Sequence, residues 1–214
     1  MNGMAMAQRV ARRTILPALL ALGMGTFAHT VFTQENIVCV PLSGEAVTEL
    51  CLVTGRIATA TTFTADRFWL LRGAVIVDAP ARLTIEAGTH IFGEFATNGP
   101  LIISRGAQIL ANGTADAPVV MTSDQPIGER ARADWGGLII NGAAPMNVPG
   151  NEAVGEGDTG IYGGTSVDDD SGHLRYVRVE FAGTEFSPDN ELNGIAFQGV
   201  GTATEVEHVM VKYS

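Results

Sequence analysis

The sequence predicts an all-β fold in which the chain coils upon itself as a parallel β-helix, and two internal echoes are the main reason. Residues 174–181 match residues 206–213 at a shift of 32, with apolar residues at the same four positions. Another set recurs in type and order 18 residues later: Leu83, Ile85, Gly88 and Ile91 return as Leu101, Ile103, Gly106 and Ile109. A β-sandwich with strands that match by chance is the alternative. Because the turn glycine recurs together with the strands, we favour the coil.

Composition supports the same fold class. The chain of 214 residues contains 26 glycines, and only 17% of its residues are charged, which is typical of a turn-rich β protein. The apolar runs after residue 58 are four to six residues long, too short for helices, and Gly- or Asn-Gly-bearing turns separate them. Several runs are aliphatic without strict alternation, as expected for strands buried in a parallel stack. We therefore assign residues 58–214 to the β-helix.

The first 28 residues are predicted to be an export signal. Three arginines precede an apolar stretch at residues 15–28, and residues 26–28 (TFA) offer a small-residue cleavage site. The stretch is shorter than the roughly 20 apolar residues that a membrane-spanning helix needs, so no span is expected after cleavage. An uncleaved N-terminal anchor is the alternative, and Arg12-Arg13 leaves a twin-arginine signal open. The expected location is periplasmic, outer-surface or extracellular.

The net charge of the chain restricts which kinds of partner we expect it to bind. Removal of residues 1–28 takes away three of the 13 basic residues and leaves 10 basic and 23 acidic residues, a net charge of −13. A surface this acidic repels phosphate backbones and anionic lipid, so nucleic-acid binding is not expected. Cations, neutral sugars or another cell-surface component are better partners.

The two cysteines lie in the lead-in segment at residues 29–57. In an exported chain, Cys39 and Cys51 are expected to form a disulfide that closes a small N-terminal loop. Two reduced, buried thiols are the alternative. A metal site is disfavoured, because two cysteines without a nearby histidine make an incomplete zinc set.

Residues 141–172 form a glycine-rich segment that we expect to leave the coil as a long loop. Seven acidic residues and no lysine or arginine occur between residues 134 and 172. Calcium prefers six to eight oxygen ligands, which makes four aspartates candidate ligands: Asp158, Asp168, Asp169 and Asp170. Their spacing matches no EF-hand loop, and a solvated acidic turn is the alternative. No other cofactor is expected.

The chain ends at Ser214 directly after a strand that echoes an earlier one. An uncovered last coil would expose an unpaired edge. We therefore expect the β-helix to be truncated at its C-terminal end, with a missing C-terminal module or a partner covering it.

Four sequence blocks give the chain a family resemblance: LTIEAGTHIFG, PLIISRGAQILANGTADAPVVMTS, DWGGLIINGAAP and YGGTSVDDDSGHLRYVRVEFAGTEFSPDNELNGIAFQGVG. With these blocks, residues 57–214 resemble uncharacterised bacterial secreted or cell-surface proteins with right-handed parallel β-helix repeats, a group often misnamed as lipoproteins or transporters. The resemblance implies a right-handed coil that continues past residue 214. It brings no established catalytic residues, so none is assigned.

Some side chains are candidates for chemistry. Arg178 and Glu180 lie on the outward face of one predicted strand, and Lys212 occupies the matching position of the next coil. Such a group could act on a polysaccharide, but a surface salt-bridge ladder between coils is the favoured interpretation. Trp69, Trp135 and Tyr162 could stack on sugar rings, although Trp135 is better explained as a buried residue. The chain has no G-x-S-x-G motif and no phosphate-binding loop.

These observations predict an exported β-solenoid scaffold or binding and adhesion module without intrinsic catalysis. The alternative is a lyase or hydrolase of the parallel β-helix type that acts on a polysaccharide.

Overall fold

The computed structural model describes residues 33–34, 36–42, 47–187 and 190–214, and the predicted export signal lies outside these residues. The described chain is built of short strands with two 3-10 turns, η1 (Pro149–Asn151) and η2 (Glu156–Asp158). Within this part of the chain, no helix has the length and apolar character to cross a bilayer. The predicted all-β class is confirmed.

The strands stack in parallel into three walls. The first wall contains residues 49–54 of β3 (Glu49–Ile57), residues 67–71 of β5 (Arg67–Val77), β7 (His90–Gly93), β10 (Val119–Ser123), residues 177–180 of β14 (Gly172–Glu180) and residues 209–212 of β18 (Glu205–Lys212). The second wall contains residues 56–57 of β3, residues 75–77 of β5, β8 (Leu101–Ile103), β11 (Leu138–Asn141) and β17 (Ile195–Gln198). The third wall contains β4 (Thr61–Phe63), β6 (Arg82–Ile85), β9 (Gln108–Asn112), residues 172–175 of β14 and residues 205–207 of β18.

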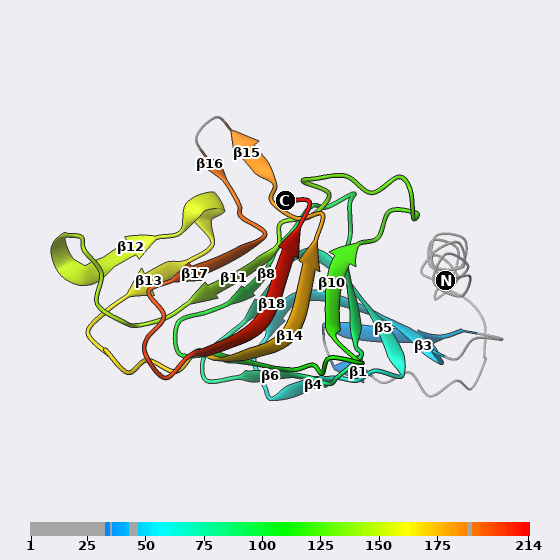
Figure 1. Cartoon of the computed structure of the whole chain (residues 1–214), viewed down its shortest axis with the longest axis horizontal. Helices are drawn as coiled ribbons and strands as arrows, with labels where there is room; N and C mark the ends of the chain where they lie inside the picture. Colours follow the sequence, from blue (N-terminus) through cyan, green and yellow to red (C-terminus); the bar gives the residue numbers. More distant parts are fainter. Residues whose placement is uncertain (1–32, 35, 43–46, 188–189) are drawn as a thin grey trace.

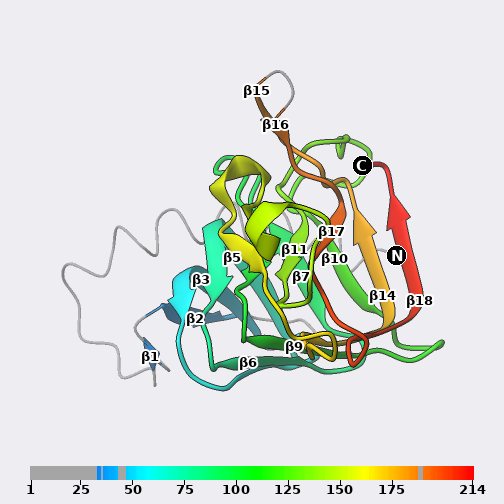
Figure 2. The ribbon, with the colours of Figure 1, turned by 90° about the vertical axis from the view of Figure 1, so that its left-hand side faces the viewer.

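The chain passes through the third, first and second walls in turn and then repeats, which is the path of a right-handed parallel β-helix (Figures 1 and 2). The predicted fold is therefore confirmed. The 32-residue echo is a true coil repeat, because Leu174 pairs with Val206 and Val179 pairs with Val211 across β14 and β18. Parallel pairing already begins at β3, whose residues we had placed in the lead-in segment.

The 18-residue echo does not mark one coil. Leu83 of β6 stacks on Ile109 in the third wall, whereas Leu101 of β8 stacks on Leu138 in the second wall. The echo repeats a corner instead: in both places a strand is followed by a turn glycine with positive φ, 81° at Gly88 and 83° at Gly106. The same strand–turn–strand sequence is thus used at two different corners.

Four of the described strands cross from one wall to the next without a loop. β3 bends at Gly55 (φ 62°), β5 at Gly73 (φ 65°), β14 at Tyr176 (φ 48°) and β18 at His208 (φ 54°). A positive φ is unfavourable for a residue with a β-carbon. At the last two bends the rings stack on each other, with centroids 4.2 Å apart and planes inclined by 13°. Such aromatic pairs contribute about 0.5–1.5 kcal/mol beyond area burial, which offsets part of this strain.

At the N-terminal end, β2 (Ile37–Pro41) pairs antiparallel with β3 and with β1 (Thr33–Gln34). Cys39 and Cys51 lie directly opposite each other in this pair and form a disulfide, as predicted.

Inward side chains of successive coils stack into a single core. Trp69, Ile91 and Met121 follow one another along the first wall and are 0–2% exposed. Trp69 stacks on Phe63 with ring centroids 4.1 Å apart. Trp135 is fully buried, and its Nε1 donates a hydrogen bond to the Glu180 carbonyl at 2.9 Å. Both tryptophans are therefore core residues, and neither is available to stack on a sugar.

Two hairpins project from the body of the solenoid (Figure 1). They are β12 (Glu152–Val154) with β13 (Ile161–Gly163), and β15 (Glu185–Ser187) with β16 (Asn190–Glu191). The first lies within the segment that we expected to leave the coil. Arg105 holds it in place, because it forms an ion pair with Glu152 and its Nη1 donates to the Gly163 carbonyl at 2.7 Å.

Candidate functional site: a polar groove on the third wall

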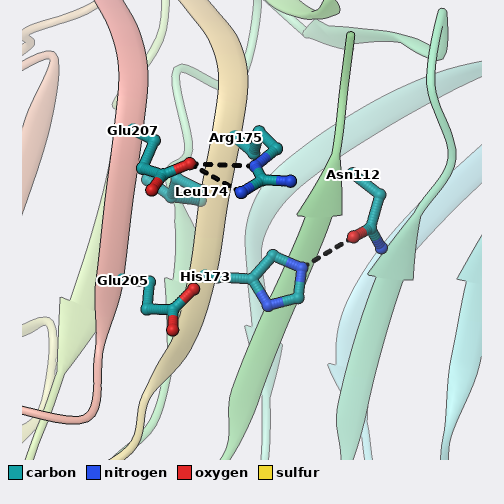
Figure 3. Close-up of a pocket in the computed structure, with 6 residues that line it drawn as sticks. All are labelled: Asn112, His173, Leu174, Arg175, Glu205 and Glu207. Atoms are coloured by element: carbon teal, nitrogen blue, oxygen red, sulfur yellow. Dashed lines mark hydrogen bonds and ion pairs between the residues drawn. The ribbon is translucent and has the colours of Figure 1, made fainter.

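Alternate residues of the third wall point outward and line a groove. Leu110, His173 and Glu205 occupy neighbouring positions on β9, β14 and β18. Two hollows of about 170 and 250 Å³ lie here and share His173 and Glu205, so we treat them as one groove; Figure 3 shows the residues of the first. The other lining residues are Arg82, Gln108, Asn112, Asp170, Gly172, Leu174, Arg175, Ala203 and Glu207.

At one end of the groove, hydrogen bonds pair residues of adjacent coils. The Nε2 of His173 lies 2.7 Å from the amide oxygen of Asn112 (Figure 3). Arg175 donates from Nε and Nη2 to one carboxylate oxygen of Glu207, at 3.0 and 2.7 Å. Among the residues that the structure describes, the exposed side chain of Glu205 has no hydrogen-bond or ion-pair partner. Its carboxylate is thus free to meet a ligand.

The opposite end of the groove is also polar. Arg82 donates from Nε to the side-chain oxygen of Gln108 at 2.9 Å, and Gln108 donates to the Asp170 carbonyl at 3.2 Å. Strands of a sheet are spaced about 4.8 Å apart, so the four strands from β6 to β18 extend over roughly 14 Å. Hydrogen-bond donors and acceptors line the groove over this length. Such an arrangement suits the hydroxyl groups of a short oligosaccharide.

The four predicted calcium ligands are not gathered at one point. Asp169 accepts hydrogen bonds from the Ala143 backbone N–H and the Ser171 hydroxyl, both at 2.9 Å, so its carboxylate braces the coil. Asp158 and Asp168 are exposed, and Asp170 accepts from the Gly172 N–H. Among the described residues, no three of these carboxylates lie within 4.8 Å of one another. Calcium binding by this set stays a prediction.

One close group of possible ligands does occur in the described chain, at Cys39, Glu49 and Cys51. Both sulfur atoms are consumed by the disulfide, so this group cannot hold a metal as thiolates.

The expected salt bridge between Glu180 and Lys212 does not form, although the two residues are in register. Glu180 instead lies 3.3 Å from Nε of Arg178 on its own strand, while the Nζ of Lys212 lies 5.0 Å from the ring centroid of Tyr213. Salt bridges between coils occur at other positions: Arg67–Glu49, Arg72–Glu94 and Arg175–Glu207.

His90 projects from the outer side of the first wall. Burial lowers the pKa of this imidazole, and the charges of Arg178 and Arg130 lower it further. The Gly88 carbonyl, which lies 3.0 Å from Nδ1, and the charge of Glu180 raise the pKa, but by less than the other effects lower it. His90 is therefore neutral near pH 7.

Our sequence reasoning missed the groove. The signal was present, because the 32-residue echo already aligned His173 with Glu205 and Arg175 with Glu207. The sequence-based prediction of outward side chains covers only Arg178 and Glu180, in the half of the strand beyond the bend.

A family model described as a pectate-lyase-like β-helix domain matches residues 55–214. No curated protein and no solved structure matches the chain.

Proposed function

Because the chain belongs to the family of pectate-lyase-like β-helix domains, we propose that it is an exported β-solenoid module that binds a glycan in the groove of the third wall. The observation that carries this proposal is the groove itself, in which side chains of four strands present donors and acceptors to solvent on a rigid floor. Sites built on strands hold their geometry better than sites built on loops.

The pairing of the charged groups favours binding over catalysis. Arg175 and Glu207 hold each other by two hydrogen bonds, and His173 is anchored to Asn112. Side chains fixed in this way lose little conformational entropy when a ligand binds. A lyase of this shape needs a metal together with a free basic residue, and the Arg175 guanidinium is already bound to a carboxylate.

Export is supported by the disulfide between Cys39 and Cys51, because such bonds persist in oxidising compartments. The acidic surface of the mature chain indicates a neutral rather than a polyanionic glycan.

The test is binding of the full chain to matched neutral and anionic polysaccharides, measured by affinity electrophoresis and by calorimetry with short oligomers. We expect retention on a neutral polymer and at least a tenfold loss of affinity when Arg175 and Glu207 are both replaced by alanine. The matched control replaces Arg56 and Asp78, an ion pair between coils that lies outside the groove. Binding that survives the first pair of substitutions but not the second would overturn the assignment of the groove.

A lyase or hydrolase is the second candidate, and the family match favours it. Glu205 and Glu207 also point outward from one strand, two residues apart, which places their backbone positions about 7 Å from each other. A pair of neighbouring carboxyl groups is what a glycoside hydrolase uses for catalysis. New reducing ends or unsaturated products from a polysaccharide panel, lost in Glu205→Gln, would establish an enzyme and remove the scaffold proposal.

A further inference from the structure

Two buried oxygen atoms on the outer side of the second wall have no hydrogen-bond partner in the described part of the chain. They are Oδ1 of Asn141 and Oε1 of Gln198, which belong to residues in direct register on β11 and β17. Asn141 is only 1% exposed. Leaving a buried acceptor unsatisfied costs about 1–3 kcal/mol, so two such atoms side by side call for an electropositive partner.

The orientation of the Asn141 amide is fixed by its other atom. Nδ2 donates a hydrogen bond to the Thr159 carbonyl at 2.8 Å, so Oδ1 is the free end. Thr159 is 3% exposed, and its hydroxyl donates to the Glu156 carbonyl at 2.9 Å. The hydroxyl oxygen therefore keeps its lone pairs for another partner.

The side chains of Thr159 and Gln198 meet at Gly155, which lies directly after β12 in the turn of the β12–β13 hairpin. Asn141 joins them through its register with Gln198 and its hydrogen bond to the Thr159 carbonyl. A β-carbon on Gly155 would lie 2.3 Å from Oγ1 of Thr159 and 2.5 Å from Oε1 of Gln198. These two oxygens are separated by no more than the sum of those distances. Calcium ligands lie about 2.3–2.6 Å from the ion, so two oxygens this close can share one ion.

The electrostatic surroundings favour a cation. Glu156 and Asp158 of η2 flank Thr159, and no lysine or arginine occurs between residues 134 and 172. Arg105 neutralises Glu152 at the open end of the hairpin, but Glu156 and Asp158 have no basic partner among the described residues. Such carboxylates create a negative potential that attracts cations.

We propose that a calcium ion binds between the β12–β13 hairpin and the second wall. Its ligands are Oδ1 of Asn141, Oε1 of Gln198 and Oγ1 of Thr159, with a carboxylate of η2 and water completing the shell. Calcium accepts amide and hydroxyl oxygens in a flexible shell, whereas magnesium demands a near-ideal octahedron and retains most of its water. The ion would fasten the hairpin to the solenoid. Asp168, Asp169 and Asp170 take no part.

The test uses the full chain after treatment with a chelator. Calorimetric titration with calcium should give one site, and the melting temperature should be higher in calcium than in chelator or in magnesium. Thr159→Val removes one ligand without changing side-chain shape and should weaken calcium binding at least tenfold. Gln198→Met provides a second variant should the first fail to fold. Asp168→Asn and Asp170→Asn are the matched controls and should bind as the parent does.

Equal melting temperatures in calcium and chelator, with no heat of binding, would overturn the proposal. Loss of binding in the aspartate controls while Thr159→Val still binds would also overturn it, because the ligands would then be those of residues 168–170. A crystal grown in calcium that places an ordered water between Asn141 and Gln198 would show that water satisfies both oxygens, and would likewise refute the site.

Discussion

Trp135 packs directly against Gly93: a β-carbon built on residue 93 would lie 2.5 Å from Cβ of the tryptophan. Trp135 stands just before β11 of the second wall, and Gly93 ends β7 of the first wall. The contact therefore packs one wall against the next, and the indole adds a hydrogen bond to the Glu180 carbonyl.

Replacing Gly93 with alanine should destabilise the protein. The added methyl group overlaps the fully buried Trp135, and over-packing of this kind costs about 1–3 kcal/mol. The measurement is the free energy of unfolding in urea. Gly128→Ala is the control, since a β-carbon there meets no atom within 4 Å and only its φ of 94° is strained. A smaller loss of unfolding free energy for Gly93→Ala than for this control would contradict the packing argument.

Arg72→Ala should cost much more stability than Arg175→Ala. Arg72 donates three hydrogen bonds of 2.8–3.0 Å to Glu94, whose side chain is only 11% exposed. Removing one partner of a buried pair strands the other charge and costs about 3 kcal/mol. The Arg175–Glu207 pair is about half exposed on both sides, and such pairs contribute less than about 1 kcal/mol. Equal decreases in stability of the two variants, measured by thermal unfolding, would be inconsistent with this difference in burial.

Acidification should destabilise the protein through His90. The pKa of His90 is lower in the folded chain than its ordinary value of 6.5, chiefly because of burial. As the pH falls, the unfolded chain therefore takes up a proton on this imidazole before the folded chain does. The contribution of neutral His90 to the free energy of unfolding is complete above pH 6.5 and is lost as the pH falls below that value. His90→Gln should show a shallower fall in unfolding free energy between pH 7.5 and 5. A nuclear magnetic resonance titration of His90 checks the direction, and a value above 6.5 would refute it.

Reduction of the disulfide should loosen the N-terminal end. Cys39 and Cys51 are 12 residues apart, and closing a loop of this length stabilises a folded chain by about 3 kcal/mol in the chain-entropy model. Unfolding in urea with and without dithiothreitol measures the effect. The Cys39→Ser/Cys51→Ser double variant is the control, because its stability should be low and insensitive to the reductant.

Much of the fold could be predicted because a coil repeats its strands. Residues 174–181 and 206–213 share both the alternation and the bend, and their true register is the one that the sequence match indicates. The match between Leu83 and Leu101 misled us, since similar sequence identifies a similar corner and does not say to which wall the strand belongs. Only the hydrogen-bonded register separates these cases.

The candidate sites were harder to predict, because composition does not reveal how a polar group is used. Asp169 belongs to an acidic run, yet its carboxylate accepts a backbone N–H and a hydroxyl group of the coil. Asn141 and Gln198 carry no charge and lie 57 residues apart in the sequence, so only their pairing in the sheet shows that they are neighbours.

The corners of the solenoid determine where new sequence can be added. From the third wall to the first, β14 and β18 turn within the strand at Tyr176 and His208. From the first wall to the second, residues 94–100, 124–137 and 181–194 connect the strands in successive coils, and the β15–β16 hairpin lies in the last of these segments. Peptides grafted into the exposed part of these connections, at residues 127–129 or in the β15–β16 hairpin, should leave the stacked registers intact. An insertion at residue 176 would separate the groove from the wall that supports it.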